Sequence, residues 1–280
     1  MSPSRLTRVL ARCLVSLVAA GTVSVISAAP AAAASCTLNS TNGTITRFIG
    51  LRTYTVHVPP GLTGQSVPLM LALHGQLIGT SKQHESDTGW SPYADSHNFI
   101  VAYPQAIGNW WDLTGSGDIN YLRAVVDNIS ASWCVDQKAV FAEGHSAGAY
   151  MSQRIACDAA DKFASVVTYA GSDATLFGPS CNPSRPIGVG MFHGLLDTTV
   201  PWIVDQQSAN LWKGTGRNNC TASAKSFDSY GTLTKYTSCS AGVSVWLRLL
   251  YSATHLMPQG ATAADQRNKM WSFLTANRMP

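Results

Sequence analysis

The pentapeptide Gly144-His145-Ser146-Ala147-Gly148 is the feature that most constrains the fold of this chain. It follows a short apolar run, residues 139–142, that predicts a buried strand, and it opens a stretch, 147–159, that is predicted to be helical. The flanking glycines permit a tight turn between the two elements. We therefore expect the Ser146 hydroxyl to stand above a sheet edge, at a helix N-terminus that favours negative charge.

Apolar runs alternate with helical patterns along the rest of the chain, which predicts an α/β fold with a mostly parallel sheet covered by helices on both faces. The predicted strands are residues 52–58, 67–73, 99–103, 139–142, 165–169, 187–192 and 243–250. Asp118 is expected to cap a helix, and a last helix is expected near 264–276. The polar segment 221–238 is expected to leave the sheet.

The first 34 residues have the layout of a secretory signal peptide. Three arginines precede an apolar stretch, and the small residues 31–34 supply an A-x-A-like cleavage site. We expect a secreted chain with one catalytic domain, residues 35–280. No later run is long and apolar enough to span a membrane. An alternative remains open, in which Cys36 is lipidated.

The charge of the chain argues against some classes of partner. The net charge of +4 falls to about +1 once the three leader arginines are removed, and no run of Lys and Arg remains. Nucleic acid is therefore not an expected partner. No phosphate-cradling loop or H-E-x-x-H pattern is present, so neither a metal nor another cofactor is expected. The chain is expected to be a monomer.

Cysteine usage agrees with export, because an even number of cysteines in an oxidising compartment predicts disulfides. Six follow the leader: Cys36, Cys134, Cys157, Cys181, Cys220 and Cys239. Several pairings are possible, and we expect Cys157–Cys181, Cys220–Cys239 and Cys36–Cys134. A zinc site is a poor alternative, because no C-x-x-C pair exists.

A serine hydroxyl is a weak nucleophile and needs a base that is itself oriented by an acid. After a serine in this setting, the partners follow in the order acid, then histidine. Two histidines follow Ser146. His255 falls between the last strand and the last helix and is the expected base, whereas His193 is expected to shape its own loop.

Asp197 is the expected acid, because it comes just after the predicted strand 187–192. Two alternatives fit less well. Asp173 follows the preceding strand, one sheet position early, and Asp205 falls inside a predicted helix.

Two backbone N–H groups are expected to form an oxyanion hole. They belong to Ala147, directly after Ser146, and to Gln76, in the loop after the strand 67–73. His74, at the start of that loop, is expected to pack and to form hydrogen bonds rather than act as a base.

Three tryptophans lie near predicted loops at the carboxyl edge of the sheet: Trp110, Trp111 and Trp202. They are candidates for a pocket that holds an aromatic ring or a sugar face. The alternative, that each anchors a loop or fills the core, is equally open.

These segments together resemble the secreted α/β-hydrolase esterases of the polyhydroxybutyrate depolymerase, feruloyl esterase and acetylxylan esterase family. The resemblance runs from about residue 53 to the C-terminus and rests on the pentapeptide and on residues 68–75, 87–90, 101–104, 154–157, 163 and 193–201. Two departures are the sequence Thr254-His255-Leu256-Met257-Pro258, where the family usually has Gly before its histidine, and the run 76–80, which lacks the family's Cys/Gly-rich oxyanion loop.

The resemblance implies an α/β-hydrolase fold and a serine carboxylester hydrolase that releases feruloyl or acetyl groups from plant cell-wall polysaccharide. Depolymerisation of poly-3-hydroxybutyrate is the alternative. It is disfavoured because depolymerases of solid polymer usually carry a linker and a binding domain, and no Pro/Thr/Ser-rich linker is found. A non-catalytic secreted binding protein on the same scaffold is a more distant alternative.

Overall fold

The computed structural model describes residues 41–62, 64–76, 79–171 and 181–280. Its strands are β1 (Gly43–Ile49), β2 (Arg52–Val58), β3 (Val67–Leu73), β4 (Ile100–Pro104), β5 (Val135–His145), β6 (Ser165–Tyr169), β7 (Gly188–Gly194), β8 (Ala222–Phe227), β9 (Gly231–Thr237) and β10 (Val245–Leu250). Its α-helices are α1 (Ser81–Thr88), α2 (Trp90–His97), α3 (Gly117–Ser130), α4 (Ala147–Asp158), α5 (Ile203–Lys213) and α6 (Gly260–Ala276). The predicted signal peptide, 1–34, and Cys36 lie outside the described residues.

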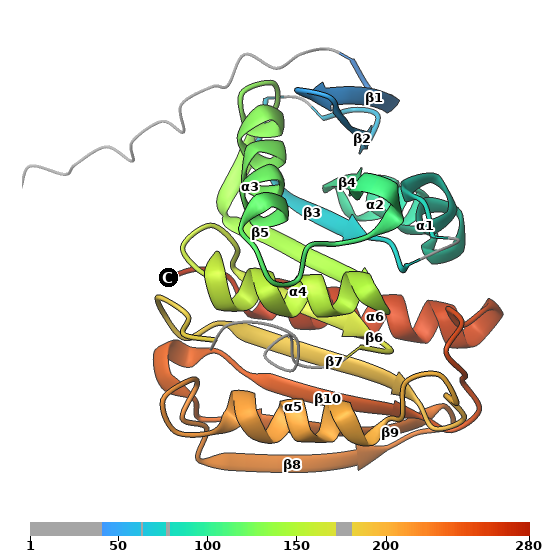
Figure 1. Cartoon of the computed structure of the whole chain (residues 1–280). Coiled ribbons are helices and arrows are strands. Elements are labelled where there is room, and N and C mark those ends of the chain that lie inside the picture. Colours follow the sequence, from blue (N-terminus) through green and yellow to red (C-terminus); the bar gives the residue numbers. More distant parts are fainter. Residues whose placement is uncertain (1–40, 63, 77–78, 172–180) are drawn as a thin grey trace, which may run out of the picture. The chain divides into compact units, whose positions relative to one another are not determined.

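The strands form one sheet in the order β1-β2-β4-β3-β5-β6-β7-β10-β9-β8 (Figure 1). The six central strands, from β4 to β10 in this order, run parallel. The two strands at each edge are antiparallel to their neighbours, so the sheet is mixed rather than parallel throughout. Parallel central strands end at one edge, which brings the loops after β3, β5, β7 and β10 to the same side.

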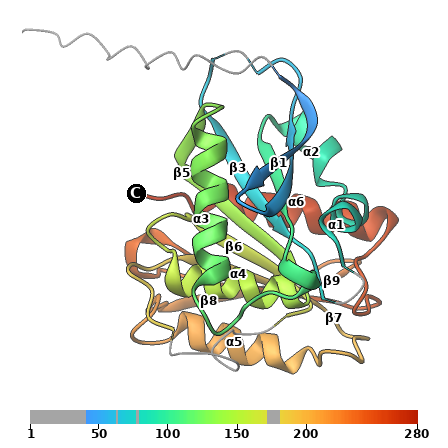
Figure 2. The ribbon, with the colours of Figure 1, turned by 45° about the horizontal axis from the view of Figure 1, so that its top comes forward.

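Helices cover both faces of the sheet, as the alternating pattern predicts (Figure 2). One apolar cluster packs α3, α4 and α5 against one face, and Trp212 of α5 is fully buried there. A second cluster packs α2 and α6 against the other face, around Trp90 and Phe273. The central strands are therefore buried on both sides, which explains their nearly continuous apolar sequences.

The expectation that residues 221–238 leave the sheet is wrong. This segment forms β8 and β9, which extend the sheet at its edge, with Ala222 paired to Thr237. All six residues of β8 are exposed, so the strand carries no apolar face from which it could be predicted. At the opposite edge, β1 was also not predicted, although its residues alternate between half-buried and exposed.

The expectation that Asp118 caps a helix is also wrong. The helix α3 begins at Gly117, and its N-cap is Ser116. The Asp118 carboxylate instead accepts a hydrogen bond from the backbone N–H of Asp112 at 2.6 Å and pairs with Arg52 at 2.5 Å. Asp118 therefore fastens the preceding loop to β2 from within the first turn of the helix.

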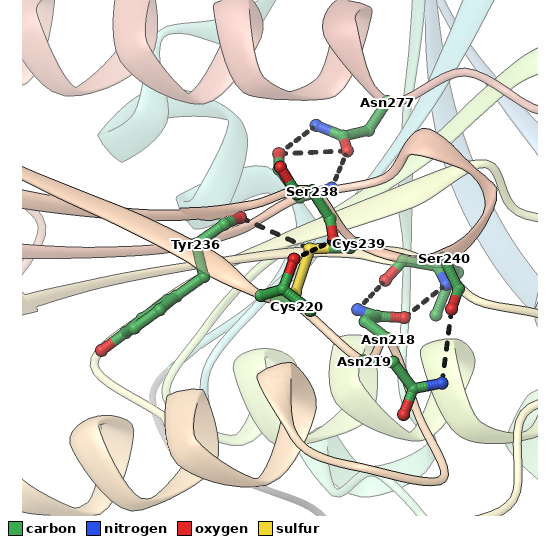
Figure 3. The surroundings of a disulfide bond; sticks show 11 residues. Asn218, Asn219, Cys220, Tyr236, Ser238, Cys239, Ser240 and Asn277 are labelled. Carbon is green, nitrogen blue, oxygen red and sulfur yellow. Dashed lines mark hydrogen bonds between the residues drawn. A yellow bond between two sulfur atoms is a disulfide. The ribbon is translucent and has the colours of Figure 1, made fainter.

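Two of the expected disulfides, Cys157–Cys181 and Cys220–Cys239, are present. The second joins the segment before β8 to the end of β9, where Ser240 N–H donates to the carbonyl of Asn218 (Figure 3). The third expected disulfide involves Cys36, which the structure does not describe. Among the described residues, none of the helices has the length and apolar character needed to cross a bilayer.

Candidate active site

Ser146 lies at the sharp turn between β5 and α4. Its backbone has φ 53° and ψ −119°, a conformation that residues with side chains rarely adopt. A Cβ at Gly144 would lie 2.2 Å from the carbonyl oxygen of Gly148, and a Cβ at Gly148 would lie 2.1 Å from that of Leu73. The glycines of the pentapeptide are therefore required by close backbone packing, and the turn holds the Ser146 hydroxyl above the sheet edge.

The structure brings Ser146, His255 and Asp197 together from three separate segments. Ser146 Oγ lies 3.0 Å from Nε2 of His255, and Nδ1 of the same ring lies 2.8 Å from Oδ2 of Asp197. Asp197 follows β7, and His255 lies between β10 and α6. A neutral imidazole that donates from Nδ1 to the carboxylate presents an acceptor nitrogen to the hydroxyl.

Backbone donors fix the carboxylate of Asp197. Its Oδ1 accepts hydrogen bonds from the N–H groups of Thr199 at 2.8 Å and Val200 at 2.9 Å. Burial by itself would raise the pKa of Asp197, but the Val200 N–H, the His255 ring and the Thr199 N–H together hold it below its usual value. Asp197 is therefore a charged acceptor aimed at His255.

His193 lies behind Asp197 and is fully buried. Its Nδ1 is 2.8 Å from Oδ2 of Asp205, and its Nε2 is 2.8 Å from the carbonyl oxygen of Val200. Burial raises the pKa of Asp205 to about 6, although the hydrogen bond to His193 opposes that rise. Nε2 of His193 is also 3.1 Å from Asp197 Oδ2. This histidine therefore supports the loop after β7 that carries Asp197.

The loop after β3 lies directly beside Ser146. A Cβ at Gly75 would be only 3.4 Å from Cβ of Ser146. His74 anchors the loop: its Nδ1 is 2.6 Å from the carbonyl oxygen of Gly75, and its Nε2 accepts from the Ala106 N–H at 3.1 Å. Burial lowers the pKa of His74 to about 4, so the ring is neutral, as its acceptor role requires. Gln76 follows in the same loop.

A cavity of about 540 Å³ opens at Ser146 and His255. One wall comes from the loop after β3, including Gln76, and another from α1, including Gln83 and Asp87. The third wall is the stretch 252–259 around His255, with Thr262 of α6. Ala147, the other expected oxyanion donor, is buried directly behind Ser146 as the first residue of α4.

The structure brings none of the three tryptophans to the described lining of this cavity. Trp111 is 6% exposed, and its indole N–H donates to the carbonyl oxygen of His74 at 2.8 Å, so it holds the loop after β3 from behind. Trp110 is 58% exposed, and Trp202 is half-buried at the start of α5. The alternative that Trp111 anchors a loop therefore fits its position better than a role in binding a substrate ring.

Sequence reasoning missed several residues that surround the site. Asp87 lies in the segment 87–90 that resembles the family, but no role was predicted for it, and it lines the cavity beside Gln83. His145, next to Ser146 in the pentapeptide, is half-buried and lines the same cavity, with its Nε2 2.7 Å from the carbonyl oxygen of His255. His145 could have been identified from the sequence, because it directly precedes Ser146. The position of Asp87 depends on how α1 packs on β3.

A central parallel sheet with a strained serine turn after β5, a histidine after the last central strand and an aspartate between them is the arrangement of the α/β serine hydrolases. The comparison with solved structures agrees. An acetyl xylan esterase from Aspergillus awamori superposes with a TM-score of 0.66 over 82% of this chain and 98% of that one, at 18% sequence identity. The chain therefore has the α/β-hydrolase fold.

Two curated relatives give more particular similarities. The chain is 27% identical over 250 residues to feruloyl esterase B of Piromyces equi, which covers 80% of this chain and 45% of that protein. It is 35% identical over 127 residues to poly(3-hydroxyalkanoate) depolymerase C of Paucimonas lemoignei, and the aligned region covers 41% of this chain and 30% of the depolymerase. The chain thus spans less than half the length of either relative. No protein-family model matches it.

Proposed function

We propose that the protein is a serine carboxylester hydrolase with Ser146 as nucleophile, His255 as general base and Asp197 as the acid that orients it. The hydrogen-bonded chain from Ser146 Oγ through the His255 ring to Asp197, at 3.0 Å and 2.8 Å, carries this proposal. These distances are within the reach required for proton transfer and for fixing the tautomer.

The proposed reaction has two steps. Ser146 Oγ attacks the ester carbonyl carbon while Nε2 of His255 takes the hydroxyl proton, and the alcohol leaves as the protonated ring returns that proton. Water, activated by the same nitrogen, then attacks the acyl-enzyme, and the acid departs as Ser146 recovers its proton. Asp197 stabilises the imidazolium that forms in each step.

The backbone N–H groups of Ala147 and Gln76 are the proposed oxyanion donors. Ala147 begins α4, where helix N–H groups have no partner within the helix. Gln76 lines the cavity in the loop that His74 and Trp111 fix beside Ser146. Such a fixed pair of donors stabilises the developing negative charge without reorganisation.

The proposed substrates are feruloyl or acetyl esters of plant cell-wall polysaccharide. Similarity to a feruloyl esterase over 80% of the chain supports this choice, as does the fold shared with an acetyl xylan esterase. A cavity of about 540 Å³ lies within the range of pockets that enclose small organic ligands and would admit an aromatic acyl group.

A second candidate is depolymerisation of poly-3-hydroxybutyrate or a similar polyester. The 35% identity to a polyhydroxyalkanoate depolymerase supports it, although over only 41% of the chain. Both candidates use the same nucleophile and differ in the acyl group that the cavity accepts.

The proposed setting is extracellular, and the proposed active form is a monomer without a cofactor. The leader, residues 1–34, and the two disulfides support export, since disulfides persist in oxidising compartments.

Substrate panels test the two candidates directly. The purified chain would be incubated with methyl ferulate, with acetylated xylan and with a suspension of poly-3-hydroxybutyrate, with Ser146→Ala as the matched control. We expect release of ferulate or acetate by the wild-type chain alone. Clearing of the polymer suspension with no release from the first two substrates would support the polyester candidate instead.

A further inference from the structure

Three consecutive carbonyl groups beside the active site each accept a hydrogen bond from a different element. The carbonyl of Ala253 accepts from the N–H of Leu196 at 3.0 Å. The next, that of Thr254, accepts from the Tyr169 hydroxyl at 2.6 Å, and that of His255 accepts from Nε2 of His145 at 2.7 Å. The segment that carries the proposed base is thus held from β5, from β6 and from the loop after β7.

This segment has no regular structure of its own. The strand β10 ends at Leu250 and α6 begins at Gly260, and the backbone between them forms turns, bends and irregular stretches. The position of the His255 ring therefore depends on what its backbone contacts. Its neighbour Leu256 is 70% exposed, so packing on that side contributes little.

His145 is suited to hold this backbone because its ring is half-buried and neutral. Burial lowers the pKa of His145 to about 3, so a proton on Nε2 serves to donate to the His255 carbonyl rather than to carry charge. The ring centroid lies 5.2 Å from that of His255 and 5.8 Å from that of Tyr169. A Cβ at Gly75 would lie 3.2 Å from Nδ1 of His145, so the ring also borders the proposed oxyanion loop.

Tyr169 links the nucleophile to the base through one residue. Its carbonyl oxygen accepts from the Ser146 N–H at 2.9 Å, and its hydroxyl donates to Thr254. Tyr169 is the last residue of β6 and is fully buried, so it is a rigid spacer between the two reacting segments.

We propose that His145 and Tyr169 are positioning residues that hold the backbone of Thr254 and His255 and thereby set the distance from Nε2 of His255 to Oγ of Ser146. This proposal rests on the proposed function. Rates of such reactions are sensitive to small misplacements, and about 1 Å costs on the order of 100-fold. Loss of either donor should therefore reduce kcat. His145 also lines the cavity, whereas Tyr169 is not part of its described lining, so KM should change little in a Tyr169 variant.

The test compares four variants on p-nitrophenyl acetate. His145→Phe removes the donor and keeps an aromatic ring, and His145→Gln restores an N–H at a similar reach. Tyr169→Phe removes only the hydroxyl. Tyr54→Phe is the matched control, because Tyr54 is an equally buried tyrosine whose hydroxyl donates to Asn128 in another part of the fold, at 2.7 Å.

We expect kcat to fall about 10- to 100-fold in His145→Phe and about 10-fold in Tyr169→Phe, with KM within about twofold of the wild-type value in Tyr169→Phe. His145→Gln should recover most of the loss, and Tyr54→Phe should leave kcat unchanged. The rate of Ser146 labelling by a fluorophosphonate should follow kcat across the series.

Wild-type kcat in both His145→Phe and Tyr169→Phe, with only a lowered melting temperature, would overturn the positioning role and leave the proposed function intact. Failure of His145→Gln to exceed His145→Phe in kcat, when both are folded by circular dichroism, would overturn the role of the donor. Undiminished labelling of Ser146→Ala would instead overturn the proposed function. If His145→Phe does not fold, Tyr169→Phe and His145→Gln still decide the outcome.

Discussion

Ser146 is held in a strained backbone conformation, with φ 53° and ψ −119°, that costs about 1–3 kcal/mol. The surrounding contacts offset this cost: the Ser146 N–H donates to Tyr169, and its carbonyl accepts from the N–H of Ala149 at 2.8 Å. The strain keeps the hydroxyl outside both β5 and α4, free to meet His255. At the scale of single residues, the site is therefore built by constraints on backbone as much as by side chains.

The assignment of the base to His255 rather than His193 predicts unequal effects. His255→Ala should lower kcat about 10⁴-fold or more, because the hydroxyl loses its proton acceptor. His193→Ala should mainly lower the free energy of unfolding, since it leaves the buried Asp205 carboxylate without its partner. Steady-state kinetics and urea unfolding of both variants check this. An active His255→Ala together with an inactive, folded His193→Ala would reverse the assignment.

His74 predicts how stability depends on pH. Its pKa is about 4 in the folded chain against about 6.5 in an unfolded one, so the folded state excludes the proton. The stability that neutral His74 contributes is complete above about pH 6.5 and is lost as the pH falls towards 4. Between pH 7 and pH 5 this loss amounts to about 2 kcal/mol.

The variant His74→Gln isolates this effect, because an amide oxygen can accept from Ala106 N–H but does not titrate. Its free energy of unfolding, measured by urea at pH 7 and pH 5, should fall by about 2 kcal/mol less than that of the wild-type chain. Equal falls in the two proteins would show that His74 is not the group involved.

Among the elements, β8 stands apart because all six of its residues are exposed. Among the described strands it pairs with β9 alone, and it buries no apolar side chain, so main-chain hydrogen bonds and the Cys220–Cys239 bridge hold it in place. The residues of the candidate site follow other strands. A change in the stability of β8 should therefore leave the proposed reaction unaffected.

Removal of this bridge should therefore loosen one element without changing the site. The double variant Cys220→Ser with Cys239→Ser should lose about 3 kcal/mol of unfolding free energy, as expected for a loop of this length. Hydrogen exchange in β8 and β9 should speed up while kcat stays the same. A large fall in kcat with unchanged exchange would contradict this separation.

The central elements could be predicted from sequence because they are buried on both faces. Residues 67–73 and 165–169 coincide with the central strands β3 and β6, which are nearly continuous apolar runs, whereas 52–58 was found as β2 from its alternation of polar and apolar residues. By contrast, β8 and β9 are edge strands with polar sequences, so the same criterion could not find them. The prediction that Asp118 caps a helix was wrong for a related reason. A carboxylate near the start of a helix can pair with Arg52 as readily as it can cap the helix N-terminus.

The candidate site shows the same division. Ser146, Asp197 and His255 could be predicted from their order along the chain and their places after predicted strands, and the structure brings these side chains within hydrogen-bond distance. The cavity walls could not be predicted in this way. Asp87 lines the cavity because of the way α1 packs, and the Trp111 side chain points inward to His74. The local sequence does not determine where either side chain points.

At the scale of the whole molecule, the leader determines the expected charge and setting. The chain carries +4, of which three charges belong to Arg5, Arg8 and Arg12. We predict that expression of the full chain in a secreting host yields a product that begins at Ser35. Intact-mass and N-terminal analysis of the secreted protein checks this. A product that begins at a lipid-modified Cys36 would support the lipoprotein alternative instead.

Covalent labelling by a fluorophosphonate tests the central claim most directly, because the reagent captures a serine only where a base activates it. Peptide mass spectrometry of the labelled wild-type chain should place one adduct per molecule on Ser146, and Ser146→Ala should remain unlabelled. An adduct on another serine, or a labelled Ser146→Ala variant, would contradict the assignment of Ser146 as the nucleophile.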